Sequence, residues 1–207
     1  MIKIPSKELN IRYGLLCLDF VNTVFWRLRE KPIEGFTDYS VLLKWSQKIW
    51  LLTETETTHL LQEAQKHPDK AALVLSRAIN LRESLYRIIV TTQKGNHVNN
   101  NDIDILNSEL SEMLHRTALF HVNGKFVWGW KVSENEMDQM LWPILYSSSE
   151  LLTSSDLERV GICEGDGCGW FFYDQSRNRS RKWCDMGDCG NRAKARRFYK
   201  RKSGNKE

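Results

Sequence analysis

The chain has 207 residues, of which 41% are hydrophobic and 27% charged, and this composition predicts a globular protein rather than a disordered or fibrous one. The sequence has no apolar run of the roughly 20 residues that a membrane span needs, and no apolar stretch after Met1 like that of a signal peptide, so we expect a cytoplasmic protein with no membrane partner. The formal net charge is +4, but residues 160–207 carry 12 basic and 6 acidic side chains, which indicates that one end of the chain meets a polyanion.

The first predicted helix runs from Leu15 to Trp26 and just beyond, and it carries polar side chains in an otherwise apolar sequence. One interpretation is a network of hydrogen bonds that joins helices, because buried polar groups need partners. The other is the polar end of a small-molecule pocket walled by Trp26, Phe20 or Trp45. The candidate pocket residues are Asp19, Asn22, Thr23, Trp26 and Arg27.

A series of helices is predicted over residues 39–114. Thr53 and Glu56 have the spacing of a capping box, and Pro68 suits the first position of a long helix that ends before Gly95. The helix before the capping box shows helical spacing at Tyr39, Leu42, Leu43, Ile49 and Trp50. The helix after Gly95 has an apolar stripe at Ile103, Leu106, Leu110, Met113 and Leu114.

One β-hairpin is predicted, with strands at 118–122 and 125–130 around an Asn123-Gly124 turn. A last helix of the amino-terminal region is expected from Glu134 to Leu152, with a kink at Pro143. A mainly α domain over residues 1–155 follows, and residues 156–207 form a second, smaller unit.

Four of the five cysteines form two similar pairs, each with a glycine directly after its second cysteine. Tetrahedral zinc binds four thiolates, and glycines let the backbone turn back towards the sulfurs. Two disulfides or four unrelated thiols are the alternatives, and a reducing compartment disfavours disulfides. We therefore predict one structural Zn²⁺ held by Cys163, Cys168, Cys184 and Cys189.

Between the cysteine pairs, residues 170–173 are predicted to form a short strand and residues 182–183 its return. The intervening loop places Arg177, Arg179 and Arg181 at every second position, so an extended loop would point all three one way. The aromatic side chains are expected to form a small core under the metal. A stacking platform for single-stranded bases is the alternative.

A basic helix is predicted from about Arg192, with Asn191 as its N-cap. Ala195, Phe198 and Tyr199 fall on one stripe, which we expect to dock on Trp170 and Trp183. The opposite arc carries the candidate nucleic-acid contacts Arg192, Lys194, Arg196, Arg197, Lys200 and Arg201. The fold expected for residues 156–207 is a treble-clef-like or ribbon-like module that ends in this helix. The same arc could also bind an anionic membrane or an RNA.

The carboxy-terminal region resembles the CGNR zinc finger. Cys189-Gly190-Asn191-Arg192 spells the tetrapeptide that names it, and Cys-x4-Cys-Gly-Trp170-Phe-Phe, Ser176 to Arg181 and Trp183-Cys184 fit the same pattern. Residues 14–23, followed by Trp26-Arg27, resemble the opening of the ABATE domain, which accompanies this finger in bacterial proteins. The resemblance implies a stress-responsive transcription regulator with the finger as DNA binder, and it implies no enzymatic activity.

Three classes of function follow. The first is a regulator that binds duplex DNA, with an amino-terminal domain that senses a small effector or forms a homodimer. The second is an RNA-binding zinc protein, because aromatics between arginines also suit unpaired bases. The third, an enzyme, is disfavoured, because Asp19 has no partner nucleophile or base at a recognisable spacing and four cysteines leave zinc no open position.

Overall fold

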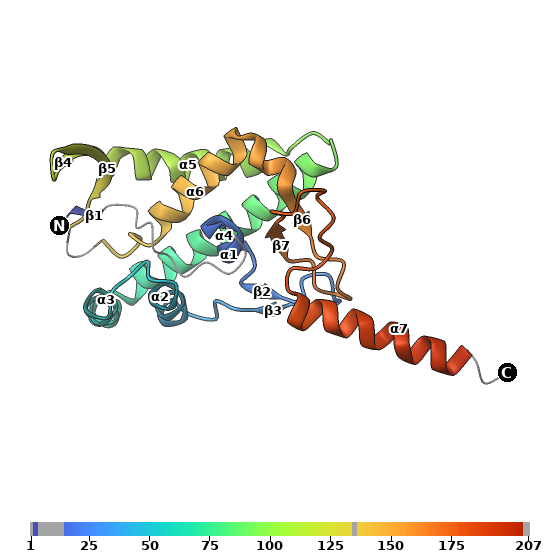
Figure 1. Ribbon diagram of the computed structural model, residues 1–207. Coiled ribbons are helices and arrows are strands. Elements are labelled where there is room, and N and C mark those ends of the chain that lie inside the picture. Colours follow the sequence, from blue (N-terminus) through green and yellow to red (C-terminus); the bar gives the residue numbers. More distant parts are fainter. Residues whose placement is uncertain (1, 4–14, 134–135, 205–207) are drawn as a thin grey trace.

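The computed structural model describes residues 2–3, 15–133 and 136–204 and is mainly helical (Figure 1). The long helix α4 (Pro68–Gln93) crosses the middle of the molecule. Helices α5 (Asn100–Arg116) and α6 (Leu141–Thr153) lie on one side of it, and α2 (Tyr39–Lys48) and α3 (Glu54–Lys66) on the other. The short helix α1 (Leu16–Val21) packs against α4 and α6, so all six of its residues are buried.

The predicted helix signals of this domain are confirmed at α3 and α4. Thr53 and Glu56 make the reciprocal capping box of α3, and Pro68 occupies the first turn of α4. The stripe predicted on α5 is only partly correct. Leu106 and Met113 are buried, whereas Leu114 is 60% exposed.

Two helix predictions were wrong in their bounds. Helix α1 ends at Val21, because Val24 and Phe25 leave the helix to form strand β2, and Trp26 has a positive φ of 53°. Residues 137–140 form turns, so α6 begins only at Leu141, while residues 134–135 lie outside the described part of the chain. Pro143 therefore lies in the first turn, where a proline removes no intrahelical hydrogen bond. It gives no reason for the kink that we predicted.

The predicted hairpin is confirmed as β4 (Thr117–Val122) and β5 (Lys125–Lys131), with positive φ at Asn123 and Gly124. Strand β1 (Ile2–Lys3) pairs with the other edge of β5. A second hairpin of β2 (Val24–Phe25) and β3 (Ile33–Glu34) was not predicted. It places residues 26–32 beside the first cysteine pair.

The carboxy-terminal unit begins with a 3₁₀ turn, η1 (Ser155–Arg159), followed by β6 (Val160–Ile162) and β7 (Phe171–Tyr173). Strand β7 pairs with β6, so the predicted pairing with residues 182–183 is wrong. A π-helical turn, η2 (Met186–Gly190), leads directly into α7 (Asn191–Gly204). The first cysteine knuckle is thus the turn of the β6–β7 hairpin, and the second pair of cysteines leads into the final helix.

The two units share one interior. Phe171 and Phe172 are buried in the same apolar cluster as the residues of α1 and α4, and Phe171 contacts the ring of Tyr86 at 5.2 Å between centroids. The aromatics of β7 therefore lie at the boundary between the two units, as well as beneath the cysteines.

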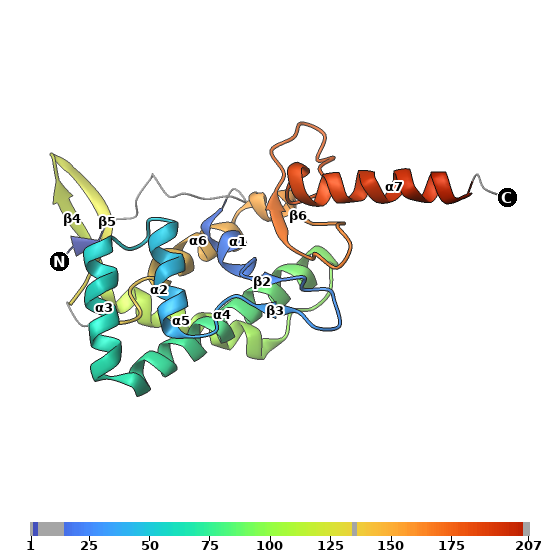
Figure 2. The ribbon, with the colours of Figure 1, turned by 90° about the horizontal axis from the view of Figure 1, so that it is seen from below.

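Helix α7 extends away from the body of the molecule in both views (Figures 1 and 2). Phe198 and Tyr199 are 62% and 68% exposed, so the predicted docking of the apolar stripe on Trp170 and Trp183 is wrong. Asn191 is the first helical residue rather than the N-cap, because the turn η2 continues into the helix and Asp185 accepts the backbone N–H of Asp188.

None of the helices in the described ranges combines the length and the apolar character needed to cross a bilayer.

Candidate metal centre and nucleic-acid interface

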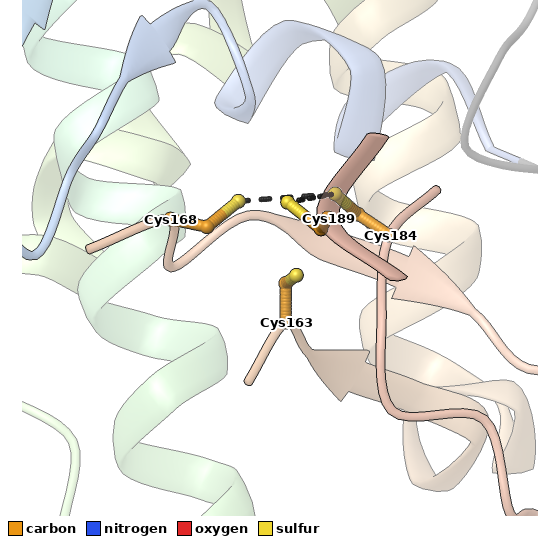
Figure 3. A group of neighbouring side chains, drawn as sticks. All are labelled: Cys163, Cys168, Cys184 and Cys189. Carbon is orange, nitrogen blue, oxygen red and sulfur yellow. Dashed lines mark hydrogen bonds between the residues drawn. The ribbon is translucent and has the colours of Figure 1, made fainter. Parts of the chain in front are cut away.

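The four predicted zinc ligands come together in the structure (Figure 3). All four are buried, and their Sγ atoms lie within 4.8 Å of one another. The Sγ of Cys184 is 3.8 Å from the Sγ of Cys168 and 3.8 Å from that of Cys189. A tetrahedron of sulfurs about 2.3 Å from a central zinc ion has edges of about 3.8 Å, whereas sulfurs in a disulfide are about 2.0 Å apart. The cluster therefore fits one structural Zn²⁺ ion.

Tight turns bring these sulfurs together. A Cβ added to Gly165 would lie 2.9 Å from the Sγ of Cys189, so only glycine fits inside the first knuckle. The Gly165 N–H donates to the Sγ of Cys163 at 3.3 Å, which is the contact predicted for the glycines. Hydrogen bonding from Cys168 lowers the pKa of Cys163 and favours its thiolate, the form that binds metal.

Arg192, the last residue of the CGNR tetrapeptide, is held at the metal centre. Its guanidinium donates to the Sγ of Cys189 at 3.0 Å and pairs with Asp188 at 2.6 Å. It also lies over the ring of Trp26, 4.6 Å from the centroid, and Arg29 lies 3.8 Å from the same ring. The side chain therefore joins the metal centre, the start of α7 and the β2–β3 turn.

Backbone hydrogen bonds also fix the first knuckle to the amino-terminal domain. The N–H groups of Arg27 and Leu28 donate to the carbonyls of Cys168 and Gly167 at 3.1 and 3.2 Å. The indole Nε1 of Trp170 donates to the carbonyl of Val24 at 2.6 Å. The position of the zinc module relative to the helices is thus set by directional bonds on both sides of the knuckle.

The polar residues of the first segment explain part of this docking. Asn22 donates from Nδ2 to the carbonyl of Phe171 and accepts the Phe171 N–H through Oδ1, both at 2.8 Å. Thr23 donates to the carbonyl of Phe20. Arg27 pairs with Glu83 at 2.6 Å and lies over the ring of Tyr86. The hydrogen-bond interpretation of the sequence holds for these side chains.

Replacing Asn22 should destabilise the docking of the two units. We expect Asn22→Ala to cost about 1–3 kcal/mol of unfolding free energy, because it leaves two buried backbone groups of Phe171 without partners. Urea unfolding followed by circular dichroism measures this, with Asn107→Ala on the exposed face of α5 as the control. A variant as stable as the wild type would show that water replaces the amide without cost.

The predicted pocket residues divide between two places. Asp19, Asn22 and Thr23 line a cavity of about 620 Å³ between α1, α2 and the zinc module. Trp26 and Arg27 do not line it, because the positive φ at Trp26 turns the chain away towards the knuckle. Of the wall residues named from the sequence, Trp45 lines the cavity, whereas Phe20 and Trp26 do not, and the rest of the wall was not predicted. The further lining residues in the described part of the chain are Phe25, Gly35, Phe36, Val41, Lys44, Trp45, Lys48, Ile49 and Trp170.

The three loop arginines have different surroundings. Asp174 accepts the backbone N–H groups of Ser176 and Arg181, so the loop is folded, and the extended form that would point all three arginines one way is not adopted. Arg181 donates to the carbonyls of Tyr173, Trp183 and Cys184. Arg179 pairs with the exposed Glu158 at 3.2 Å, and Arg177 is exposed. The loop therefore offers Arg177 and Arg179 to solvent more readily than Arg181.

The cations of α7 lie on an exposed helix that extends away from the body of the molecule. Arg196 pairs with Asp166 at 2.6 Å, and Arg197 lies over the ring of Trp183. Lys194 is exposed on the first turn, and Lys200 and Arg201 are exposed further along the helix.

Cys17 lies outside the metal cluster and is 1% exposed in α1. Burial raises the pKa of its thiol to about 11, which keeps it protonated and unreactive near neutral pH. It packs as a small apolar residue in the core.

Comparison with known proteins gives two family matches and no curated relative. The CGNR zinc finger matches residues 159–202, which contain the whole metal cluster and most of α7. The ABATE family, described as "Putative stress-induced transcription regulator", matches residues 14–155. With more than half of its length matched, the chain belongs to the ABATE family and carries a CGNR zinc finger.

Proposed function

We propose that this protein is a zinc-dependent transcription regulator that binds duplex DNA through its carboxy-terminal unit. The observation that carries the proposal is α7, a helix anchored at one end by the metal centre, with cations along its exposed length (Figure 2). Such a helix can lie in a groove while its cations contact phosphates.

The roles of the individual cations follow from their surroundings. Arg192 and Arg181 are engaged at the metal centre and on backbone carbonyls, so they position the interface. The candidates for base contacts are Arg196, which Asp166 holds on the second turn of α7, and the exposed loop arginines Arg177 and Arg179. Along the rest of the helix, phosphate contacts come from Lys194, Arg197, Lys200 and Arg201.

The amino-terminal unit, residues 1–155, is proposed to sense a small effector or to mediate association into a homodimer. The cavity beside Asp19, Asn22 and Thr23 supports the sensing role. A regulator of this kind acts in the cytoplasm and needs no catalytic group.

Binding of RNA is a second candidate, favoured by one observation. Phe198 and Tyr199 are exposed on α7 beside its cations, and exposed aromatics stack on unpaired bases. In duplex DNA the bases are already stacked and offer no such platform.

Competition between nucleic acids separates the two candidates. In anisotropy titrations of the zinc-loaded full chain, we expect duplex DNA to compete better than single-stranded RNA of equal length. The log–log salt slope should lie at about −4 to −7, because about four to eight phosphates are neutralised. Preference for the single strand at every salt concentration would replace duplex DNA by RNA as the partner.

A further inference from the structure

The cavity beside α1 is shared by both units of the protein. Its walls come from α1, from the β2–β3 hairpin, from α2 and from Trp170 of the zinc module. Trp170 follows the ligand Cys168 by two residues and donates its indole N–H to the carbonyl of Val24. A molecule in this cavity would therefore contact the zinc module as well as the sensing domain.

Two aromatic pairs form parts of the wall. Phe36 and Trp45 meet edge to face with centroids 5.4 Å apart, and both belong to the α2 region. Phe25 and Trp170 lie 5.3 Å apart and join β2 to the zinc module. Walls of this kind favour a flat ring system, because ring faces and edges attract one another beyond the area they bury.

The charges of the lining favour an anion. Val41, Lys44, Trp45 and Lys48 follow the spacing i, i+3, i+4, i+7, so the two lysines and the indole share one stripe of α2. Lys44 and Lys48 are exposed, whereas Asp19, the one acid in the described lining, is 7% exposed. The amide of Asn22 and the hydroxyl of Thr23 are already hydrogen-bonded within the protein. With two exposed lysines and one buried acid, the described lining has a net positive charge, which suits an anionic ligand.

We propose that the cavity binds a planar aromatic anion, a carboxylate or sulfonate, with its ring between the two aromatic pairs and its charge at Lys44 and Lys48. This extends the sensing role proposed above. Because the ring contacts Trp170, the ligand lowers the population of the undocked zinc module. A chelator that attacks the undocked module should therefore remove zinc more slowly. A bound ligand would therefore affect the zinc module from which α7 begins.

Anilinonaphthalene sulfonate, a fluorescent planar aromatic anion, serves as the probe on the zinc-loaded full chain. We expect saturable binding to one site, weakened about fivefold or more in the double variant Lys44→Gln, Lys48→Gln, because two surface charges near the sulfonate are removed. The double variant Lys70→Gln, Lys94→Gln changes the net charge equally at exposed sites outside the lining and should bind like the wild type. Val41→Trp, which fills the cavity, should abolish binding, and near-ultraviolet circular dichroism confirms that each variant is folded.

Equal affinity in wild type and the Lys44, Lys48 variant would overturn the proposal, as would tighter binding of phenyltrimethylammonium, a cation, than of the sulfonate. The coupling is tested by the rate at which a colorimetric chelator removes zinc. Saturating probe should slow this rate several-fold in the wild type and leave it unchanged in Val41→Trp, and an unchanged rate in the wild type would remove the link to the zinc module. None of these measurements uses nucleic acid, so their failure leaves DNA binding to be judged by its own titrations.

Discussion

Removal of zinc should unfold the carboxy-terminal unit while residues 15–155 stay folded. The four thiolates account for most of the free energy that holds this unit together, since zinc contributes about 10–16 kcal/mol in comparable small sites. Its two strands have three residues each and cannot replace that contribution. The helical core of α1 to α6 does not depend on the metal, but it loses the Asn22 and Tyr86 contacts with Phe171. Its melting temperature should therefore fall by about 2–10 °C.

Limited proteolysis and metal analysis measure the outcome. Chelated protein should be cut within residues 160–192 and leave a resistant fragment that ends near residue 155. Cys184→Ala should behave like chelated protein, whereas Cys17→Ala, at the cysteine outside the cluster, should keep one zinc per chain. Visible absorbance from an iron–sulfur cluster, or resistance of the apo protein across residues 160–192, would contradict the structural zinc site.

Neutralising the exposed cations of α7 should nearly abolish binding to duplex DNA. The variant Lys194→Gln, Arg197→Gln, Lys200→Gln, Arg201→Gln removes four proposed phosphate contacts and should flatten the salt slope by about 3.6. The affinity near physiological salt should then fall about a thousandfold. Since these side chains are exposed, the zinc content should not change, and the melting temperature should fall only by the small effect of losing the Arg197 contact with Trp183.

The matched control neutralises four exposed lysines elsewhere, at positions 70, 94, 125 and 131. It has the same net charge as the α7 variant, so a general charge effect would weaken both equally. Anisotropy titrations at several salt concentrations separate the two cases. If the α7 variant bound duplex DNA as tightly as the wild type, the basic helix would have another role.

Local signals in the sequence predicted the elements that local chemistry fixes. The capping box at Thr53, the proline at the start of α4 and the Asn123-Gly124 turn each act within a few residues, and the structure contains all three. The cysteine pairs likewise carry their own spacing and turn residues, so the metal cluster could be predicted before any fold was known.

Contacts between distant segments could not be predicted. Strand β7 pairs with β6, whose residues Val160 to Ile162 lie just before the knuckle. Residues 182–183 follow the same strand, and no local signal in the sequence decides between these two partners. We expected the apolar stripe of α7 to pack on Trp170 and Trp183. The amino-terminal domain instead packs on Trp170, whose indole N–H donates to the carbonyl of Val24. The cavity was only partly foreseen, although the stripe Val41, Lys44, Trp45 and Lys48 could have indicated a second wall.

The interior that the two units share makes this zinc finger unlike a portable module. A finger cut from the chain at residue 156 would expose Phe171 to water and lose the Asn22 amide and the Val24 carbonyl that hold β7 and Trp170. Tandem copies of it could not fold as independent units that each contact a few base pairs. If the unit binds DNA as proposed, a longer DNA site needs a second whole molecule, and extended recognition then depends on how complete chains associate.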